Sequence, residues 1–101
     1  MTHGRRDRNH VDIREGLRRA GYYVVDTADL RNGFPDLLVV SKSGPVQLIE
    51  VKMPGEHLTY DEAIFHQVYP GRVCVCHSAE EAIGVMELLD KMEEKWKEIT
   101  K

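Results

Sequence analysis

Apolar residues recur along this chain with two different periods, and the two periods separate helices from strands. Ile13 and Leu17 repeat at helical spacing, and Gly21 is placed to end that helix. Thr59 and Ser78, both favoured helix caps, begin two further segments of helical spacing. Four short runs between the helices are rich in strand-forming side chains: residues 22–26, 36–41, 46–52 and 72–77.

The order of these elements is helix, three strands, helix, strand, helix. Three consecutive strands favour an antiparallel meander, and a helix before the fourth strand favours a crossover connection. We therefore predict an α/β fold in αβββαβα order, with a mixed four-stranded sheet flanked by helices. The second strand, residues 36–41, is almost entirely apolar, which is typical of a strand covered on both faces.

The composition indicates a single water-soluble domain. The chain has 101 residues, of which 42% are apolar and 31% charged, and this suits one domain over residues 1–101. No apolar run reaches the roughly 18 to 20 residues of a membrane span, and residues 1–8 lack the apolar core of a signal peptide. We expect a cytoplasmic protein without membrane partners, with flexible residues 1–8 and a charged helical tail over 91–101. Cys74 and Cys76 are interpreted as small buried apolar residues in a reducing compartment.

Charge is unevenly distributed along the chain. Residues 1–20 carry a net charge of +3, whereas residues 21–78 and 79–101 each carry −3, which gives −3 for the whole chain. A basic amino-terminal end permits contacts with DNA phosphates. A solvated helix face explains the same charge equally well. The arginines that we assign to DNA contacts are Arg5, Arg6, Arg8 and Arg14.

Three charged residues interrupt the apolar second and third strands. Asp36 opens the second strand, and Glu50 and Lys52 close the third. Buried charges are costly unless they are paired or bind a metal. If a hairpin pairs the two strands, the carboxylates of Asp36 and Glu50 converge at one end of the sheet, with Lys52 on the same face as Glu50. The alternative is an exposed Glu50–Lys52 pair at a strand end, which contributes little energy.

Two converging carboxylates, joined by a strand carbonyl, suit Mg²⁺ or Mn²⁺, because both ions prefer oxygen ligands. Such an ion positions a water, lowers its pKa and stabilises the charge that builds on a phosphate. Lys52 can orient that water or neutralise the phosphate. The apolar surroundings of Asp36 and Glu50 favour this metal-dependent site over the exposed pair.

The same residues resemble a known signature. Pro35-Asp36 followed by Glu50-Val51-Lys52 matches the motif of the PD-(D/E)XK nuclease superfamily, and the chain more narrowly resembles a standalone VRR-NUC domain of the phage type. This order and spacing are more specific than a Glu-X-Lys motif alone. The similar stretches cover nearly the whole chain: Asn9-His10, Ile13, Leu17-Arg18, 33–37, 48–52, Leu58-Thr59, Phe65-His66 and 75–82.

The resemblance implies a restriction-endonuclease-like core and metal-dependent hydrolysis of DNA phosphodiester bonds. It implies that Asp36, Glu50 and the backbone carbonyl of Val51 hold Mg²⁺ or Mn²⁺, and that Lys52 takes part in catalysis. Standalone members resemble Holliday junction resolvases, so the expected activity is a structure-specific endonuclease on four-way or branched DNA, and the phage type is consistent with a phage-encoded protein in a bacterial host. The alternatives are nicking of flaps or single strands, and a non-catalytic DNA-binding domain that keeps the fold.

Two positions depart from the pattern of the family. Related domains often carry glutamate in the first helix where this chain has His10, and a histidine there can bind a metal, shuttle a proton or be structural. Glutamine is usual where Glu62 stands. Glu62 either forms a capping box with Thr59 or adds negative charge beside the metal. We treat His10 and Glu62 as accessory site residues, and expect the helix face with Glu62 and Phe65 to meet the sheet.

The tail after Lys91 is charged except for Met92, Trp96 and Ile99, which continue the helical spacing. Such a tail is either solvated or binds a partner. Together with the small size of the chain and the resemblance to dimeric resolvases, Trp96 and Ile99 predict a homodimer.

Overall fold

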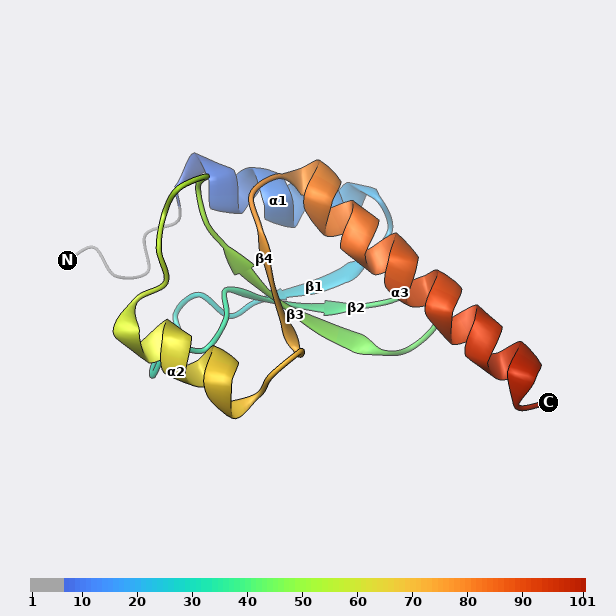
Figure 1. Cartoon of the computed structure of the whole chain (residues 1–101). Helices are drawn as coiled ribbons and strands as arrows, with labels where there is room; N and C mark the ends of the chain where they lie inside the picture. The colour runs from blue at the N-terminus through green and yellow to red at the C-terminus, as the bar shows by residue number, and fades with distance from the viewer. Residues whose placement is uncertain (1–6) are drawn as a thin grey trace.

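The predicted order of helices and strands is confirmed. The computed structural model describes residues 7–101, and Figure 1 shows four strands with helices packed around them. The expected flexibility of residues 1–8 lies outside the described residues except for Asp7, which caps the first helix, and Arg8, which begins it. The elements are α1 (Arg8–Arg19), β1 (Tyr23–Asp26), β2 (Leu37–Val40), β3 (Val46–Val51), α2 (Tyr60–Val68), β4 (Val73–Cys76) and α3 (Ala79–Ile99).

The four strands form one mixed sheet in the spatial order β1-β2-β3-β4. The meander makes β1–β2 and β2–β3 antiparallel, with Val24 opposite Val39 and Leu37 opposite Ile49. The crossover through α2 makes β3 and β4 parallel, as predicted, with Ile49 opposite Cys74. The sheet therefore places the start of β2 beside the end of β3.

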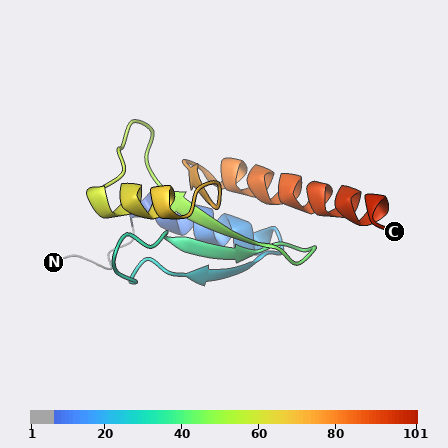
Figure 2. The same ribbon diagram turned by 60° about the horizontal axis from the view of Figure 1, so that its bottom comes forward.

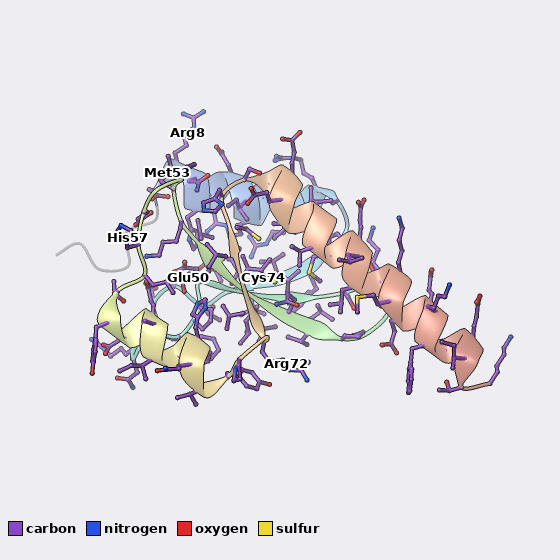
Figure 3. All side chains as sticks on the ribbon, viewed as in Figure 1. Arg8, Glu50, Met53, His57, Arg72 and Cys74 are labelled. Atoms are coloured by element: carbon purple, nitrogen blue, oxygen red, sulfur yellow. The ribbon has the colours of Figure 1, made fainter. Side chains whose placement is uncertain are left out.

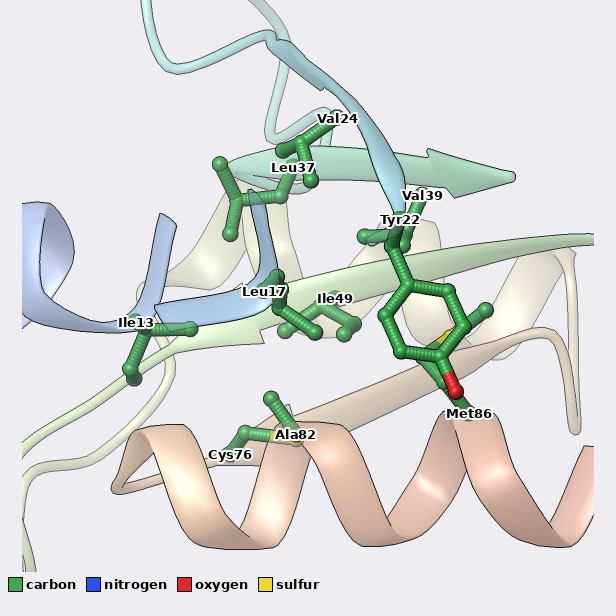
Figure 4. Close-up of a cluster of buried hydrophobic side chains, with 10 residues drawn as sticks. All are labelled: Ile13, Leu17, Tyr22, Val24, Leu37, Val39, Ile49, Cys76, Ala82 and Met86. Carbon is green, nitrogen blue, oxygen red and sulfur yellow. The ribbon is translucent and has the colours of Figure 1, made fainter. Parts of the chain in front are cut away.

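The core lies on one face of the sheet, under α1 and α3. Figure 4 shows its side chains, which come from both helices and from all four strands. Gly16 of α1 lets the two helices approach closely, because a Cβ at this position would lie 2.7 Å from the Cβ of Ala79 in α3. Cys76 belongs to this core with 1% of its surface exposed, and neither Cys76 nor Cys74 forms a disulfide. Burial of Cys76 is as predicted, whereas Cys74 of β4 is only half-buried, which corrects the prediction for that residue.

The opposite face of the sheet is largely open, which corrects the prediction for the second strand. In β2, Leu37 and Val39 are buried, whereas Leu38 and Val40 on the other face are half-buried. On that face Tyr23 and Val46, the β1 and β3 neighbours of Val40, are 69% and 53% exposed. An apolar run predicts strand burial but does not say how many faces are covered.

The helix α2 lies against this open face at one end. It has no buried residue, so its apolar face does not cover the sheet in the way that the sequence suggested. It is held instead by an edge-to-face contact between Phe65 and Phe34, with ring centroids 5.3 Å apart, and by the loop before β2. At Gly33, where φ is +77°, a Cβ would lie 2.3 Å from the carbonyl oxygen of Asp61. The close approach of loop and helix needs glycine there.

The helix α3 extends well past the sheet, as Figure 2 shows. Ser78 caps it by accepting a hydrogen bond from the amide of Glu81, and it continues to Ile99. Its final turns expose Met92, Trp96 and Ile99 by 60%, 59% and 69%. Within residues 7–101, no helix is both long enough and apolar enough to cross a membrane.

Candidate active site

The Asp36 and Glu50 side chains come together at the junction of β2 and β3. Asp36 directly precedes β2, and the pairing of Leu37 with Ile49 places it beside Glu50. Asp36 Oδ2 accepts a hydrogen bond from the amide of Val51 at 2.8 Å. Thr27 fixes the approach to β2, because its amide donates to the carbonyl of Asp36 at 2.8 Å. The convergence expected from a hairpin is therefore present.

Glu50 is a buried carboxyl group with little compensation. Only 1% of its surface is exposed, and within residues 7–101 its Oε1 atom has no hydrogen-bond partner. Burial, followed by the negative charge of Asp36, raises the pKa of Glu50 to about 10. Figure 3 shows Glu50 on the side of the strands that faces α2. Within residues 7–101, Glu50 forms no ion pair of its own, because the ammonium of nearby Lys52 is paired with Glu62.

Lys52 is also buried, but it is paired. It is 6% exposed, and its Nζ atom lies 2.8 Å from Glu62 Oε1 and 3.7 Å from Glu56 Oε2. Burial alone would lower the pKa of Lys52, but the hydrogen bond and charge of Glu62 outweigh it and raise the pKa. Lys52 is thus an ammonium group fixed at the end of β3, and the exposed Glu50–Lys52 pair that the sequence also allowed is not found.

Glu62 forms the capping box that the sequence offered as one of two alternatives, and its carboxylate also reaches Lys52. Its Oε1 atom accepts the amide of Thr59 at 2.8 Å, and Thr59 Oγ1 accepts the amide of Glu62 at 3.2 Å, so the predicted capping box is confirmed. The same carboxylate holds Lys52. Glu62 therefore ties the start of α2 to the end of β3 and places a third carboxylate near Asp36 and Glu50.

His10 reaches the site from the first turn of α1. The turn is anchored by the amide of His10, which donates to Asp7 Oδ1 at 2.9 Å, and by Asn9 Nδ2, which donates to the carbonyl of Lys52 at 3.3 Å. The imidazole is 5% exposed, and its Nε2 atom lies 3.0 Å from Oδ2 of Asp26 at the end of β1. Sequence reasoning missed Asp26, although a charged residue at the end of an apolar strand was the signal used for Glu50 and Lys52.

A polar cavity of about 180 Å³ collects these side chains. It is lined by the five site residues that the sequence predicted and by Val51. Its other lining residues come from the loop after β1, the loop after β3 and the cap of α1. The lining residues are Asp7, His10, Ala28, Asp36, Glu50, Val51, Lys52, Glu56 and Glu62.

Of the arginines assigned to DNA contacts, the described pair, Arg8 and Arg14, does not line this cavity. Arg5 and Arg6 lie outside the described residues. Arg8 Nε lies 3.8 Å from Asp12 Oδ2 on the same helix. Because the Arg8 side chain is 90% exposed, it can still reach a phosphate. Arg14 donates to Asp26 and to Glu15, each at 2.8 Å. Its guanidinium is engaged within the protein, which removes the reason for assigning Arg14 to DNA.

The donors of the cavity fit a hard divalent cation. Asp36 and Glu50 offer carboxylate oxygens, Glu50 Oε1 has no hydrogen-bond partner among the described residues, and Val51 lines the same space. Within residues 7–101, no three His, Cys, Asp or Glu side chains already stand in a metal-binding arrangement. The set that we consider uses two carboxylates and one backbone carbonyl.

A scan against protein-family models, a search of curated proteins and a search of solved structures each found no match for this chain. The function is therefore argued from the residues and from the geometry of the cavity.

Proposed function

We propose that this protein is a Mg²⁺- or Mn²⁺-dependent endonuclease that hydrolyses phosphodiester bonds in DNA. The observation that carries the proposal is the meeting of Asp36 and Glu50 in one polar cavity, with the buried ammonium of Lys52 beside them. A fully buried Glu50 beside a half-buried Asp36 reduces stability, so a structural role alone does not explain the two acids. The order Pro-Asp, then Glu-X-Lys, resembles the signature of the PD-(D/E)XK nucleases.

Five residues of the cavity have assigned tasks in this proposal. Asp36, Glu50 and the carbonyl of Val51 would hold the cation. The bound cation would supply charge stabilisation at the phosphate and a more acidic water. Lys52 presents a positive charge to the phosphate in a site with little water, where that charge acts strongly. Glu62 keeps Lys52 in position through the 2.8 Å ion pair.

Branched or four-way DNA is the proposed substrate class, on the resemblance to resolvase-like members of the family. The exposed Arg8 side chain lies in the basic amino-terminal segment, and net charge elsewhere is negative. The residues near the start of α1 would therefore make most of the contacts with DNA phosphates. Such contacts predict binding that weakens steeply as salt increases.

The test is cleavage of a labelled four-way junction, a flap, a duplex and a single strand in Mn²⁺ or Mg²⁺ at matched salt. We expect wild-type cleavage of the junction, and a loss of roughly 100-fold or more in Asp36→Ala and Lys52→Met. Glu94→Ala, on the exposed part of α3, is the matched control and should cleave normally. Undiminished cleavage by Asp36→Ala would contradict the proposal. Preference for the flap or single strand would keep the chemistry and change the substrate.

A non-catalytic DNA-binding domain is the second candidate, because the Lys52 ammonium is already engaged by two glutamates. Calorimetric titration with Mn²⁺ separates the two functions. Junction binding with neither Mn²⁺ binding nor cleavage would favour this second candidate.

A further inference from the structure

A cluster formed by His10, Asp26 and Arg14 adjoins the cavity and has no place in the function proposed so far. Asp26 Oδ2 lies 3.0 Å from His10 Nε2 and accepts a hydrogen bond from Arg14 Nη1 at 2.8 Å. Asp26 Oδ1 accepts from the amide of Ala28 at 3.1 Å. The three side chains are largely enclosed, with side-chain exposures of 6%, 14% and 21% for His10, Asp26 and Arg14. The cluster is thus a built arrangement rather than a surface ion pair.

These contacts determine which ring nitrogen of His10 carries the proton. A guanidinium is always protonated, so Asp26 beside Arg14 is a carboxylate and can only accept hydrogen bonds. The 3.0 Å contact therefore requires His10 to donate from Nε2. A neutral imidazole with its proton on Nε2 has a lone pair on Nδ1. Because His10 lines the cavity and its Nε2 atom is turned to Asp26, we infer that this lone pair faces the site.

We propose that His10 is a catalytic residue that accepts a proton from the attacking water through Nδ1, and that Asp26 and Arg14 are positioning residues that fix its tautomer. This inference rests on the proposed nuclease function. The other basic candidate, Lys52, is an ammonium held by Glu62 and cannot accept a proton. Asp36 and Glu50 are assigned to the cation.

The step balances in atoms and charge. The oxygen of water forms a bond to phosphorus while one of its protons passes to His10 Nδ1. The bond between phosphorus and the leaving deoxyribose oxygen breaks, and that oxygen takes a proton from solvent. The imidazolium of His10, stabilised by the Asp26 carboxylate, then returns its proton to solvent and regains the starting tautomer.

Charged groups of both signs surround His10. Asp26 lies at the end of β1, Arg14 lies on α1 with His10, and Asp7 is the N-cap of α1. Protonation of His10 adds a positive charge to a cavity that is otherwise rich in carboxylates. The remaining charged groups of that cavity are Asp36 before β2, Glu50 and Lys52 at the end of β3, Glu56 in the following loop and Glu62 of α2.

The tautomer is tested without any reference to activity. Long-range ¹H–¹⁵N NMR spectra of histidine-labelled protein distinguish the two neutral tautomers, and the His10→Gln variant identifies the signals of this ring. We expect the Nε2-protonated form in the wild type and a shift toward mixed tautomers in Asp26→Ala. An Nδ1-protonated ring in the wild type would overturn the proposal. Urea unfolding of both variants verifies that they are folded.

Catalysis is tested with the pH dependence of junction cleavage, measured as kcat and KM. We expect His10→Gln to lower kcat by about 100-fold with little change in KM, and to remove the acid limb of the profile. Free imidazole should restore part of the activity of His10→Ala. Calorimetry should find unchanged Mn²⁺ affinity, because a tenfold loss would make His10 a metal ligand and overturn the proposal.

The two proposals fail in different ways. If wild-type protein does not cleave DNA at all, both the nuclease function and the role of His10 are wrong. If wild type cleaves and His10→Gln cleaves with the same kcat and pH profile, His10 is structural and only this inference is overturned.

Discussion

Glu50 and Lys52 are both buried, but the protein compensates only one of them. Lys52 has an ion pair with Glu62 at 2.8 Å, whereas Oε1 of Glu50 has no hydrogen-bond partner. The like charge of Asp36 lies beside it. The folded protein without a cation therefore keeps a proton on Glu50 at neutral pH, and burial with the Asp36 charge raises its pKa from 4.5 to about 10.

The Glu50→Gln substitution should stabilise the metal-free protein at pH 8. Between pH 4.5 and about 10, folded Glu50 binds a proton that the unfolded chain has lost. The free energy of unfolding then falls as pH rises, by up to about 1.4 kcal/mol per pH unit from this group, and its contribution is fully present only below the unfolded pKa. Glutamine cannot ionise, so the variant should lose this slope and gain about 1 to 3 kcal/mol at pH 8.

Urea unfolding from pH 5 to pH 9 in chelator measures this effect, with Glu94→Gln as the exposed control. Added Mn²⁺ should stabilise the wild type but not Glu50→Gln, because a ligand that binds only the folded state raises its stability. If the free energy of unfolding of Glu50→Gln and of the wild type changed with pH in the same way, the Glu50 carboxyl would not be the cause of the pH dependence.

At the scale of elements, α2 matters as a support for the site rather than as a cover for the sheet. It delivers Glu62 to Lys52, although none of its residues is buried. Its position depends on the Phe34–Phe65 contact and on the absence of a side chain at Gly33. The loop before β2 thus controls two site residues at once, Asp36 directly and Glu62 through α2.

The Gly33→Ala substitution should displace α2 and weaken the protein. The new Cβ would lie 2.3 Å from the backbone carbonyl oxygen of Asp61 and would also sit at φ +77°. Strain and overpacking together should cost about 2 to 4 kcal/mol. Gly71→Ala is the matched control, since Gly71 has φ +76° and open space around its Cβ position, and it should lose only about 1 to 2 kcal/mol. Urea unfolding measures the free energy of unfolding of both variants. Equal losses of stability would show that the loop before β2 and α2 can move apart at little cost.

The elements were predictable because their signals are local. Gly21 ends α1 with φ +96°, and the Thr59–Glu62 spacing gives the start of α2. The pairing of Asp36 with Glu50 also followed, since a short hairpin leaves little freedom in register. The contact of His10 with Asp26 did not follow, because it depends on how α1 crosses the sheet. The open second face was missed for the same reason: hydrophobicity does not specify which element covers it.

At the scale of the whole molecule, the feature still to be explained is a row of apolar residues that runs along α3. Ala82 and Met86 of α3 belong to the core, and Ile83, Val85 and Leu89 pack against it, with Ala82, Val85 and Leu89 spaced three and four residues apart. Met92, Trp96 and Ile99 continue the same alternation of three and four residues, which is the spacing of a helix that packs against another helix. With Lys91 and Lys95 these three line a groove of about 400 Å³. The buried face of α3 therefore continues beyond the body as an exposed apolar stripe.

We expect a homodimer in which this stripe, Met92, Trp96 and Ile99, packs against its counterpart in a second copy. A double substitution of Trp96→Asp and Ile99→Asp would place charges in that contact and should convert the dimer to a monomer in light scattering across a range of concentrations. Lys97→Ala, on another side of the same helix, is the control and should remain dimeric. If Val46→Lys on the open sheet face breaks the dimer instead, the copies meet through the sheet and the prediction for α3 is wrong. Because α3 supplies no residue to the cavity, the monomeric variant should keep its Mn²⁺ affinity and lose only the paired cutting of two strands in a junction.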